Sequence, residues 1–386
     1  MHGHTPLVSV IIPTFNRAHI ISRSIESVLR QTLSDYEIIV VDDGSTDNTR
    51  TLLRDRFGDT VSYIGKPNNE GLSAARNTGI ERARGTYIAI LDDDDCWLPE
   101  KLARQVKLME SDPAPGLVYC GSLKVNGRGE VLEEMKPTKR GDIFEDLLHR
   151  NYLLGPASVA LFTRDVLRKS GLFDPDLSPC ADWDLWIRMA RCALVDFVDQ
   201  PLVHYVLHEG NMHGNIRGME KDTFALLNKY WPGLAEETGC VELKNKVYSD
   251  HAIHFAWQYY ERGEEQQFKR LLRQALEYYP LNQIVMHGDG LQARESAVMD
   301  IVRASWAAQG IAEKGKAVKK TMVSRYIQLA WEYYHQGSMS DFRRCVSLAY
   351  RHAFPHLPLR LAVPFVKSFM GKGTADAIHR VRKRLT

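Results

Sequence analysis

The chain has 386 residues, which is long for one ordinary domain and suits two. Hydrophobic residues make up 44% and charged residues 25%, both ordinary for a globular protein, and the formal net charge of +2 excludes a strong general attraction to nucleic acid. The six cysteines are scattered and form no CxxC pair, so the sequence indicates neither a zinc site nor a disulfide framework. Reduced thiols in a cytoplasmic protein are the simplest interpretation.

The N-terminal segment has an apolar run of only about seven residues and lacks the basic start of a signal peptide. No segment approaches the roughly 20 apolar residues that a membrane-spanning helix needs. We therefore expect a cytoplasmic protein that is not integral to the membrane. Peripheral attachment at the cytoplasmic face of the membrane stays open.

Residues 1–130 alternate between short apolar runs and helical stretches. The apolar runs, rich in β-branched residues and typical of central strands covered on both faces, are at 7–12, 36–41, 61–65 and 87–91. The helical stretches are at 18–31, 46–56, 71–84 and 99–111. This alternation predicts a doubly wound, mostly parallel α/β sheet with right-handed crossovers. The pattern becomes mixed after this point, and we assign residues 1–235 to one domain.

The C-terminal part, residues 240–386, predicts an all-α domain with an internal repeat. Its segments 256–280 and 330–355 align, with Ala, Trp, Tyr, Gly and Phe recurring in step. Each copy has the pattern helix, glycine turn, helix, so we expect helical hairpins at 250–280 and 324–355. Two interpretations remain open: tetratricopeptide-type repeats, or two similar hairpins in a bundle.

Polar clusters follow three of the predicted strands, at the carboxyl ends where such sheets bind ligands. The segment PTFNR follows the first strand, DDGSTD the second and DDDD the fourth. In PTFNR a ring and a cation stand where they suit a nucleotide, and a loop with a packed Phe is the alternative. Neither GxGxxG nor GxxxxGK[ST] occurs in the chain, which excludes a Rossmann dinucleotide site and a P-loop.

Four successive aspartates, Asp92 to Asp95, follow the fourth strand. In an extended segment Asp92 and Asp94 would share one face, and Asp93 and Asp95 the other. Two carboxylates on one face suit Mg²⁺ or Mn²⁺ with a diphosphate completing the shell, and an acidic turn before a helix is the alternative. Because like charges repel, we expect this site to be loose and poorly ordered until the cation and the diphosphate are bound.

The segment CADWDLWIRMARC, residues 180–192, predicts an amphipathic helix. The buried stripe is formed by Trp183, Trp186, Ile187 and Ala190. Asp184 precedes Arg188 by one helical turn, which predicts an ion pair on the helix surface. Asp182 lies at the helix entrance without such a partner. It is therefore either an N-cap or a general base, and the base would need partial burial to raise its pKa.

These stretches together resemble the inverting glycosyltransferases of family 2, which have the GT-A fold. The resemblance covers roughly residues 6–215 and is carried by VSVIIPTFNR, IIVVDDGSTDNT, NEGLSAARNTGI, YIAILDDDDCWLP and GLFDPDLSPCADWDLWIRMA. It implies a nucleotide-sugar donor, with a UDP-sugar as the expected one, bound over the strand ends. It also implies a divalent cofactor, Mg²⁺ or Mn²⁺, that bridges the diphosphate.

The resemblance also implies roles for single residues. The positions that line the nucleotide match Pro13, Thr14, Phe15, Arg17, Asp43, Arg76 and Asn77, among which Asp43 matches the acid that holds the base. Asp42 is a weaker match. Asp94 matches the direct metal ligand, and Asp92 and Asp93 match the ribose and phosphate side.

Two further positions in this resemblance lie later in the chain. Asp182 matches the catalytic aspartate that deprotonates the acceptor hydroxyl, although Ala181 stands where the family often has Glu. This departure leaves the base in place and puts the orientation of the acceptor in doubt. His208 matches a histidine that reaches the metal or the diphosphate, with His204 and His213 as alternatives.

The expected function is a metal-dependent inverting transfer of a sugar to a hydroxyl of a glycan or lipid-linked acceptor, by analogy in cell-surface polysaccharide or glycan synthesis. A nucleotidyltransferase is one alternative, but PTFNR is a poor match to its Gly-rich phosphate loop. A non-catalytic helical-repeat scaffold is another, against which the intact Asp43, Asp94 and Asp182 argue. The helical part is expected to bind the acceptor carrier, a protein partner or a second copy of the chain. Its basic C-terminal end is either a contact with an anionic membrane surface or a solvated helix end.

Overall fold

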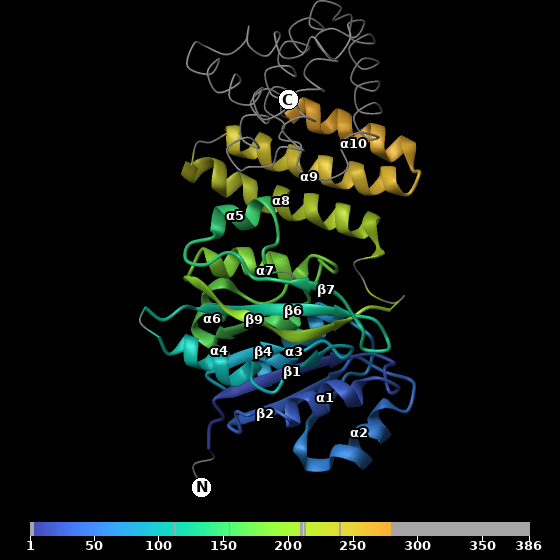
Figure 1. Ribbon diagram of the computed structural model, residues 1–386, viewed down its shortest axis with the longest axis vertical. Coiled ribbons are helices and arrows are strands. Elements are labelled where there is room, and N and C mark those ends of the chain that lie inside the picture. Colours follow the sequence, from blue (N-terminus) through green and yellow to red (C-terminus); the bar gives the residue numbers. More distant parts are fainter. Residues whose placement is uncertain are drawn as a thin grey trace, which may run out of the picture. The chain divides into compact units, whose positions relative to one another are not determined.

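The computed structural model describes residues 4–278, except residues 112, 154, 209, 210, 212, 213, 239 and 240 (Figure 1). Contacts along the chain divide it into two compact units, Met1–Val247 and Tyr248–Thr386. This division lies inside helix α9 (Val241–Glu261). The boundary that we expect between residues 235 and 240 stays a prediction.

The centre of the first unit is strand β1 (Val8–Thr14), every residue of which is buried. Strands β2 (Tyr36–Asp42) and β4 (Tyr87–Ile90) pair with β1 in parallel, and β3 (Ser62–Gly65) pairs in parallel with β2. All four strands lie at the apolar runs that predicted them. The chain builds outward from β1 to β3 and then returns to place β4 on the other side of β1. This reversal makes a switch point between β1 and β4, where doubly wound sheets bind their ligands.

The second half of the sheet is mixed. It comprises β5 (Cys96–Trp97), β6 (Leu117–Val125), β7 (Val131–Met135), β8 (Leu161–Thr163) and β9 (Val195–Val206). Strand β8 is antiparallel to both β4 and β6, whereas β9 runs parallel to β6. Within the described residues the strands form one sheet in the order β3-β2-β1-β4-β8-β6-β9-β5, with β7 on β6. The parallel order predicted from the sequence therefore applies to its first half.

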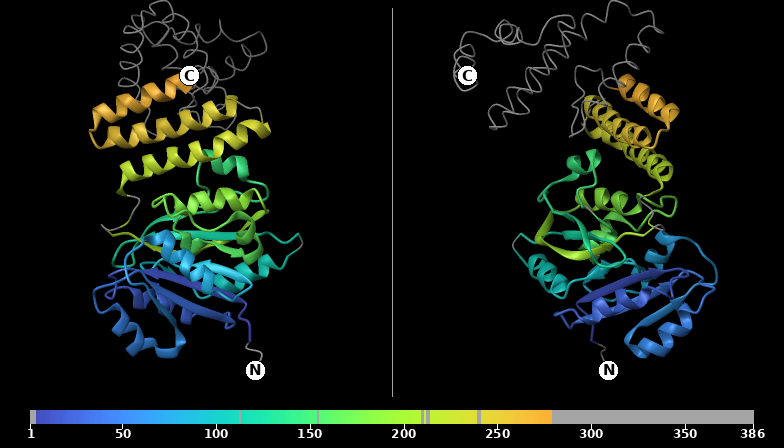
Figure 2. Two further views of the ribbon diagram at one scale, coloured as in Figure 1. Left: turned by 180° about the vertical axis from the view of Figure 1, so that it is seen from behind. Right: turned by 45° about the vertical axis from the view of Figure 1, so that its right-hand side comes forward.

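Helices lie on both faces of this sheet (Figure 2). They are α1 (Ile21–Leu29), α2 (Thr49–Phe57), α3 (Leu72–Arg82), α4 (Lys101–Met109), α5 (Phe144–His149), α6 (Arg164–Ser170) and α7 (Ala181–Ala190), with short 3₁₀ turns at Gly58–Thr60 and Ala157–Val159. Helix α3 packs against β1 and β2, and α4 packs against β6 and β9. The approach of α3 to β1 requires a glycine, because a Cβ atom at Gly79 would lie 2.4 Å from the Ile11 side chain.

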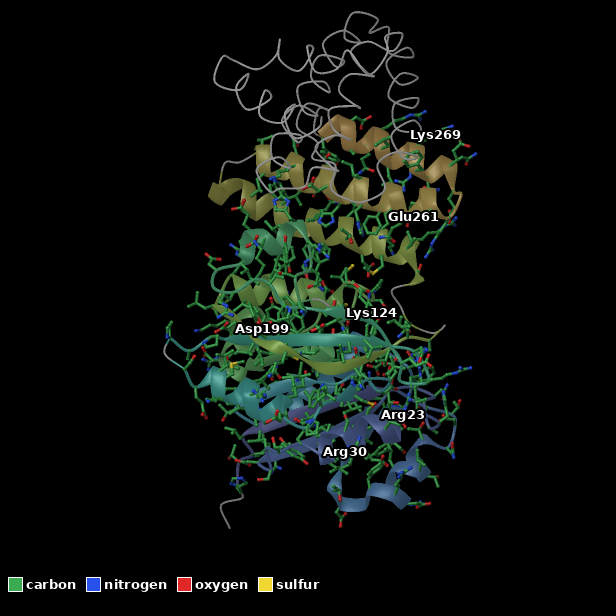
Figure 3. All side chains as sticks on the ribbon, in the orientation of Figure 1. Arg23, Arg30, Lys124, Asp199, Glu261 and Lys269 are labelled. Atoms are coloured by element: carbon green, nitrogen blue, oxygen red, sulfur yellow. The ribbon has the colours of Figure 1, made fainter. Side chains whose placement is uncertain are left out.

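Helix α1 illustrates how the sequence pattern forms these layers. Its residues Ile21, Ile25 and Val28 recur at helical spacing and are fully buried. Arg23 and Arg30 lie on its exposed side (Figure 3). The apolar stripe thus covers the sheet while the charged side chains stay in water.

Three longer helices follow the sheet. Helix α8 (Ile216–Thr238), which the sequence analysis did not predict, belongs to the first unit. Helices α9 and α10 (Glu265–Tyr278) are joined by a turn in which Gly263 has a φ of +74°, so the first copy of the repeat has the predicted helix, glycine turn, helix form. The hairpin predicted at 324–355 and the basic C-terminal end lie outside the described residues. Among the described helices, none combines the length and the apolar character of a membrane span.

Candidate active site

A cavity of about 440 Å³ lies at the switch point, where β1, β2 and β4 end. Every site residue predicted from the sequence lines it except Asn77 and His208. One wall, which we call the strand-end side, consists of the segments that follow β1, β2 and β4. The other wall, which we call the helix side, consists of residues 171–180 with α7 and α8.

The loops after β1 and β2 lock together on the strand-end side. The Asn16 backbone N–H donates to Ser45 Oγ at 2.8 Å, and Asn16 Oδ1 accepts from the Thr46 N–H at 2.8 Å. Asn16 has a φ of +54°, a left-handed conformation that Asn tolerates better than most residues. Gly44 has a φ of +81°, and a Cβ there would lie 2.7 Å from the Asn68 backbone. These contacts hold the loops of the strand-end side together.

The two acids after β2 have different surroundings. Asp43 lines the cavity and accepts from the Gly71 N–H at 2.7 Å and the Glu70 N–H at 3.1 Å, and it pairs with Lys66 Nζ at 2.9 Å. A carboxylate has about four acceptor positions, so about one remains for a ligand. Asp42 is not part of the cavity wall. Its two oxygens accept from the Ser45 N–H and the Tyr63 hydroxyl, each at 2.8 Å, which gives Asp42 a role in the turn.

The four aspartates after β4 form a turn, which corrects the extended arrangement expected from the sequence. The Asp95 N–H donates to the Asp92 carbonyl oxygen at 3.1 Å and closes this turn. Asp93 and Asp95 are nevertheless buried, whereas Asp92 and Asp94 keep 21% and 15% of their side chains exposed. Asp92, Asp93 and Asp94 all line the cavity.

Each carboxylate of the cluster has a partner, and the expectation that these acids are loose before the ligand binds stays a prediction. Asp92 Oδ1 pairs with Arg76 Nη2 at 2.6 Å, and Asp93 Oδ2 accepts from Thr14 Oγ1 at 2.6 Å. Burial raises the pKa of Asp93 to about 7, with a further rise from the charges of its neighbours. Partial protonation of Asp93 therefore reduces the repulsion within the cluster near neutral pH.

Asp95 is a structural member of the cluster. It is fully buried and accepts from Ser158 Oγ at 2.6 Å and from the Val206 N–H at 3.4 Å. Burial raises its pKa well above the usual range, and the charges of Asp94 and Asp92 add to this rise. Asp95 thereby fastens the turn to the end of β9, which leads to His208.

Asp94 and His208 form the pair that fits a divalent cation. Asp94 Oδ2 lies 2.8 Å from His208 Nε2 and 3.9 Å from Arg17 Nη1. This contact is a hydrogen bond between the two side chains, and a carboxylate oxygen and an imidazole nitrogen held side by side are also groups that could together ligate Mg²⁺ or Mn²⁺. Among the described residues no three His, Cys, Asp or Glu side chains are grouped to hold a metal ion. The pair therefore fits an ion whose remaining ligands come from phosphates and water.

Of the two alternative histidines, His204 does not join this pair. His204 lies within β9 opposite Cys96 and is not part of the cavity wall. His213 lies outside the described residues.

Arg76 and Asn77, which are neighbours in α3, have separate roles. Arg76 is 4% exposed, lines the cavity and lies with its guanidinium carbon 5.0 Å from the centre of the Phe173 ring. Asn77 Nδ2 donates to the Phe173 carbonyl oxygen, and Asn77 Oδ1 accepts from the Phe173 N–H, both at 2.9 Å. The structure therefore does not bring Asn77 to the cavity with the other predicted residues, because the Phe173 backbone uses its amide.

Asp182 is the second residue of α7 and lines the cavity on the helix side. The N-cap position belongs to Cys180, so the N-cap interpretation of Asp182 is wrong. Burial raises the pKa of Asp182 to about 6, although the positive charge of Arg76 and a hydrogen bond from the Trp183 N–H act in the opposite direction. Such a carboxylate is ionised at neutral pH and basic enough to accept a proton.

Sequence reasoning missed most of the helix side. Ser178, Pro179 and Met219 line the cavity there, and Asn151 and Tyr205 complete the wall. Ser178 and Pro179 lie inside the stretch GLFDPDLSPCADWDLWIRMA that carries the family resemblance, and Tyr205 lies three residues before His208, so these three had a signal. Asn151 and Met219 come from a loop and from α8, whose local sequence carries no motif.

Comparison with known proteins identifies the class. The glycosyl transferase family 2 model matches residues 9–171. An uncharacterized glycosyltransferase of Rickettsia typhi is 33% identical over 266 residues, which are 65% of this chain and 80% of that protein. The putative teichuronic acid biosynthesis glycosyltransferase TuaG of Bacillus subtilis is 28% identical over 218 residues, 56% of this chain and 84% of that protein. The chain belongs to glycosyl transferase family 2 and is a glycosyltransferase.

Other comparisons bear on length and fold. An uncharacterized glycosyltransferase of Rickettsia felis is 30% identical over 61% of this chain, which spans only 40% of that protein's length. The crystal structure of S. aureus TarS has a TM-score of 0.53 at 15% sequence identity, covering 80% of this chain and 55% of that chain. This likeness concerns the fold alone, and with the family membership it confirms the GT-A fold. The nucleotidyltransferase and scaffold alternatives are thereby set aside.

Proposed function

We propose that the chain transfers a sugar from a nucleotide-sugar donor to a hydroxyl group, with inversion at the anomeric carbon and with Mg²⁺ or Mn²⁺ as cofactor. The observation that carries this proposal is that one cavity is lined both by Asp94, whose carboxylate pairs with His208 and suits a divalent cation, and by Asp182, a carboxylate suited to be a base. A UDP-sugar is the proposed donor.

The strand-end side would bind the nucleotide. Phe15 is 40% exposed at the cavity and offers an aromatic face for a base. The acceptor position that remains on Asp43 suits an N–H of the base or a ribose hydroxyl. Arg17 supplies a positive charge for the diphosphate, and Asp92 and Asp93 lie on the ribose and phosphate side.

Asp94 and His208 would hold the cation. When bound, such an ion offsets the negative charge that develops on the departing nucleoside diphosphate. Arg17, 3.9 Å from Asp94, adds positive charge at the same place.

Asp182 would act as the general base on the helix side. It accepts the proton of the acceptor hydroxyl while the oxygen forms a bond to the anomeric carbon. The bond from that carbon to the diphosphate oxygen breaks, and the nucleoside diphosphate leaves with the electron pair. Attack opposite the leaving group inverts the configuration. Only one carboxylate is needed at the acceptor because no sugar–enzyme intermediate is formed.

The acceptor is proposed from analogy with relatives. TuaG is named for teichuronic acid biosynthesis, which supports a glycan or lipid-linked acceptor in cell-surface polysaccharide synthesis. Such an acceptor suits an enzyme that works at the cytoplasmic face of the membrane. The proposed roles of the helical C-terminal part, as a contact for that membrane, for a protein partner or for a second copy, concern residues mostly outside those described.

Ligand binding to the full chain tests the donor and the cofactor. We expect UDP with MnCl₂ to raise the melting temperature more than GDP does, and more than either UDP or MnCl₂ alone. A free ligand concentration of a hundred times the Kd raises the free energy of unfolding by about 2.7 kcal/mol. The variant Asp94→Asn should lose the dependence of UDP binding on MnCl₂, while Asp165→Asn, which removes an exposed carboxylate on α6, should keep it.

A panel of UDP- and GDP-sugars, with hydrolysis to the free nucleotide as readout, then identifies the sugar. Two findings together would refute the proposed function: no nucleotide changes the melting temperature with either metal, and no nucleotide-sugar is consumed.

A further inference from the structure

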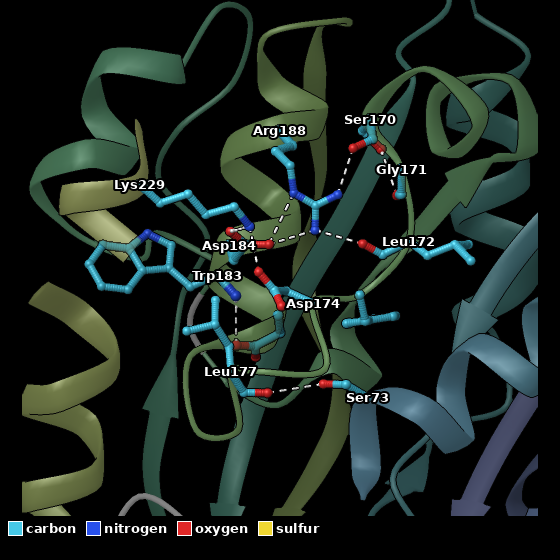
Figure 4. Close-up of polar contacts among 12 residues, drawn as sticks. Ser73, Ser170, Gly171, Leu172, Asp174, Leu177, Trp183, Asp184, Arg188 and Lys229 are labelled. Atoms are coloured by element: carbon cyan, nitrogen blue, oxygen red, sulfur yellow. Dashed lines mark hydrogen bonds and ion pairs between the residues drawn. The ribbon is translucent and has the colours of Figure 1, made fainter. Parts of the chain in front are cut away.

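A buried carboxylate connects α7 with α8 next to the proposed base. Asp184 has no exposed surface, although the sequence pattern predicted a pair on the helix surface. Its Oδ2 accepts from Arg188 Nε at 3.0 Å and Nη2 at 2.5 Å (Figure 4). Its Oδ1 accepts from the Tyr230 hydroxyl at 2.5 Å. Lys229 Nζ lies 3.5 Å from the same Oδ1. Tyr230 and Lys229 belong to α8, and Asp184 is in the first turn of α7 with Asp182.

Stability alone does not explain this arrangement. A buried ion pair costs desolvation that its attraction barely repays, and well-packed apolar residues are often as stable. A buried ion pair does fix the geometry of the elements it joins, because a shift of either side chain would leave the other charge buried and unpaired. The geometry fixed here is the position of the first turn of α7 against α8.

The same network holds the loop before α7. Arg188 Nη1 donates to the Ser170 carbonyl oxygen at 2.6 Å, and Nη2 donates to the Leu172 carbonyl oxygen at 2.8 Å. Asp174 in this loop pairs with Lys229 of α8 (Figure 4). One guanidinium and one ammonium group therefore connect α7, α8 and residues 170–174.

Helix α8 continues these contacts up to the cavity. Asp222 Oδ2 accepts from the Ser178 N–H at 2.9 Å, and Ser178 lines the cavity. Cys180 is two residues before Asp182 along the chain, and its Sγ lies 3.6 Å from Thr223 Oγ1 of α8. Met219 of α8 lines the cavity itself. The whole of α8 lies beyond residue 171, where the family match ends.

We propose that Asp184 and Tyr230 are positioning residues, which hold α8 against the first turn of α7 and so fix Asp182 where the acceptor hydroxyl must be deprotonated. This inference rests on the proposed role of Asp182 as the base. It makes α8 a part of the active site rather than a connection to the C-terminal helices. A displacement of about 1 Å at a reacting group can cost about 100-fold in rate.

The test compares two hydroxyl deletions in the full chain. Tyr230→Phe removes the hydroxyl that donates to Asp184 and also interacts with Arg188. The control, Tyr119→Phe, removes a buried hydroxyl that donates to the Lys139 carbonyl oxygen at 2.8 Å and accepts from the Lys139 N–H at 3.1 Å, away from the cavity wall. The control therefore loses at least as many hydrogen bonds. Turnover is measured as hydrolysis of the UDP-sugar chosen from the panel, with UDP and MnCl₂ as the binding probe.

We expect Tyr230→Phe to lower kcat at least about tenfold, with UDP affinity unchanged, and Tyr119→Phe to leave both unchanged. In single-turnover experiments in an Asp182→Asn background, Tyr230→Phe should cause no further loss, because its effect passes through Asp182. A purely structural role would instead lower turnover equally in both backgrounds. Equal kcat values for Tyr230→Phe and Tyr119→Phe would overturn the proposal.

A second measurement needs no substrate. Cys180 is 1% exposed, so its alkylation by iodoacetamide, followed by mass spectrometry, reports separation of α7 from α8. We expect faster alkylation of Cys180 in Tyr230→Phe than in Tyr119→Phe, and equal rates would also overturn the proposal. If Asp182→Asn instead retains near-normal turnover, the proposed role of Asp182 as the base fails, while the Cys180 rates still decide whether Tyr230 holds α7.

Discussion

The strand-end side and the helix side of the cavity are built in different ways. On the strand-end side, functional side chains directly follow β1, β2 and β4, and neighbouring loops bind one another through short polar contacts such as Asn16 Oδ1 to the Thr46 N–H. On the helix side, residues 171–180 are held by side chains from remote parts of the chain. Ser73 Oγ of α3 donates to the Leu177 carbonyl oxygen at 3.1 Å, and Asp222 of α8 accepts from the Ser178 N–H.

This difference indicates that the two sides of the cavity have different functions, donor binding and the deprotonation of the acceptor. The strand-end side lies within the region that the family model matches, and the proposed nucleotide contacts and Asp94 are there, whereas His208 follows the end of β9. The helix side lies mostly beyond residue 171 and depends on α8, so it can change without disturbing the donor contacts. We therefore expect variants on the two sides to separate donor binding from turnover.

The largest separation is expected for Asp182→Asn. The amide keeps the shape of the carboxylate but cannot accept the acceptor proton, and general base catalysis is worth about 10² to 10⁴ in rate. Hydrolysis and transfer should fall by this factor, while the affinity for UDP with MnCl₂ should stay the same. Calorimetric binding and steady-state turnover measure the two quantities.

Asp176→Asn is the matched control for this variant. Asp176 belongs to the segment 171–180, but its carboxylate is exposed and does not line the cavity. Turnover of Asp182→Asn close to that of the control, in a folded protein, would remove Asp182 from the mechanism.

A smaller effect is expected from acid. The base must be ionised, and the pKa of Asp182 is raised by burial to about 6, so turnover should rise with pH through this value and level off near neutral pH. At about pH 5 only about a tenth of Asp182 would be ionised, which predicts roughly a tenfold loss of kcat. The residual activity of Asp182→Asn should not show this fall of kcat at low pH. If kcat of that variant falls in the same pH range, the group that titrates is not Asp182.

The same contrast explains what the sequence could predict. The strands β1 to β4 were predicted from their apolar runs, and the polar clusters after three of them were expected at one edge because strand ends of a parallel sheet meet there. The roles of Asp94, Asp43 and Thr14 came from the family resemblance. Period-two alternation failed for Asp92 to Asp95 because the chain turns there, closed by the Asp95 N–H. Local sequence does not reveal such a turn when its residues are all alike.

The helix side was harder to predict because its contacts are non-local. Asp184 and Arg188 have the spacing of a surface pair, and only the packing of α8 makes Asp184 buried. Asn77 lies on the same helix as Arg76, yet the backbone of Phe173 takes its amide. Short antiparallel strands such as β5 and β8 also depend on partners remote in sequence. None of these outcomes follows from periodicity or from a motif.

The smallest effect on UDP binding is expected for Asn77→Ala. This variant tests whether Asn77 contacts the nucleotide or only supports the backbone of Phe173. It removes two hydrogen bonds to the Phe173 backbone, each 2.9 Å long, and leaves a buried N–H and carbonyl without these partners. We expect the free energy of unfolding to fall by about 1–3 kcal/mol and the affinity for UDP with MnCl₂ to change less than about twofold. The neighbouring variant Thr78→Ala, which loses one hydroxyl contact to the Ala74 carbonyl oxygen within α3, is the control and should be nearly neutral. Urea unfolding and calorimetric UDP titration give the two values.

A marked loss of UDP affinity with unchanged stability would instead show that Asn77 contacts the nucleotide, as the sequence resemblance implied.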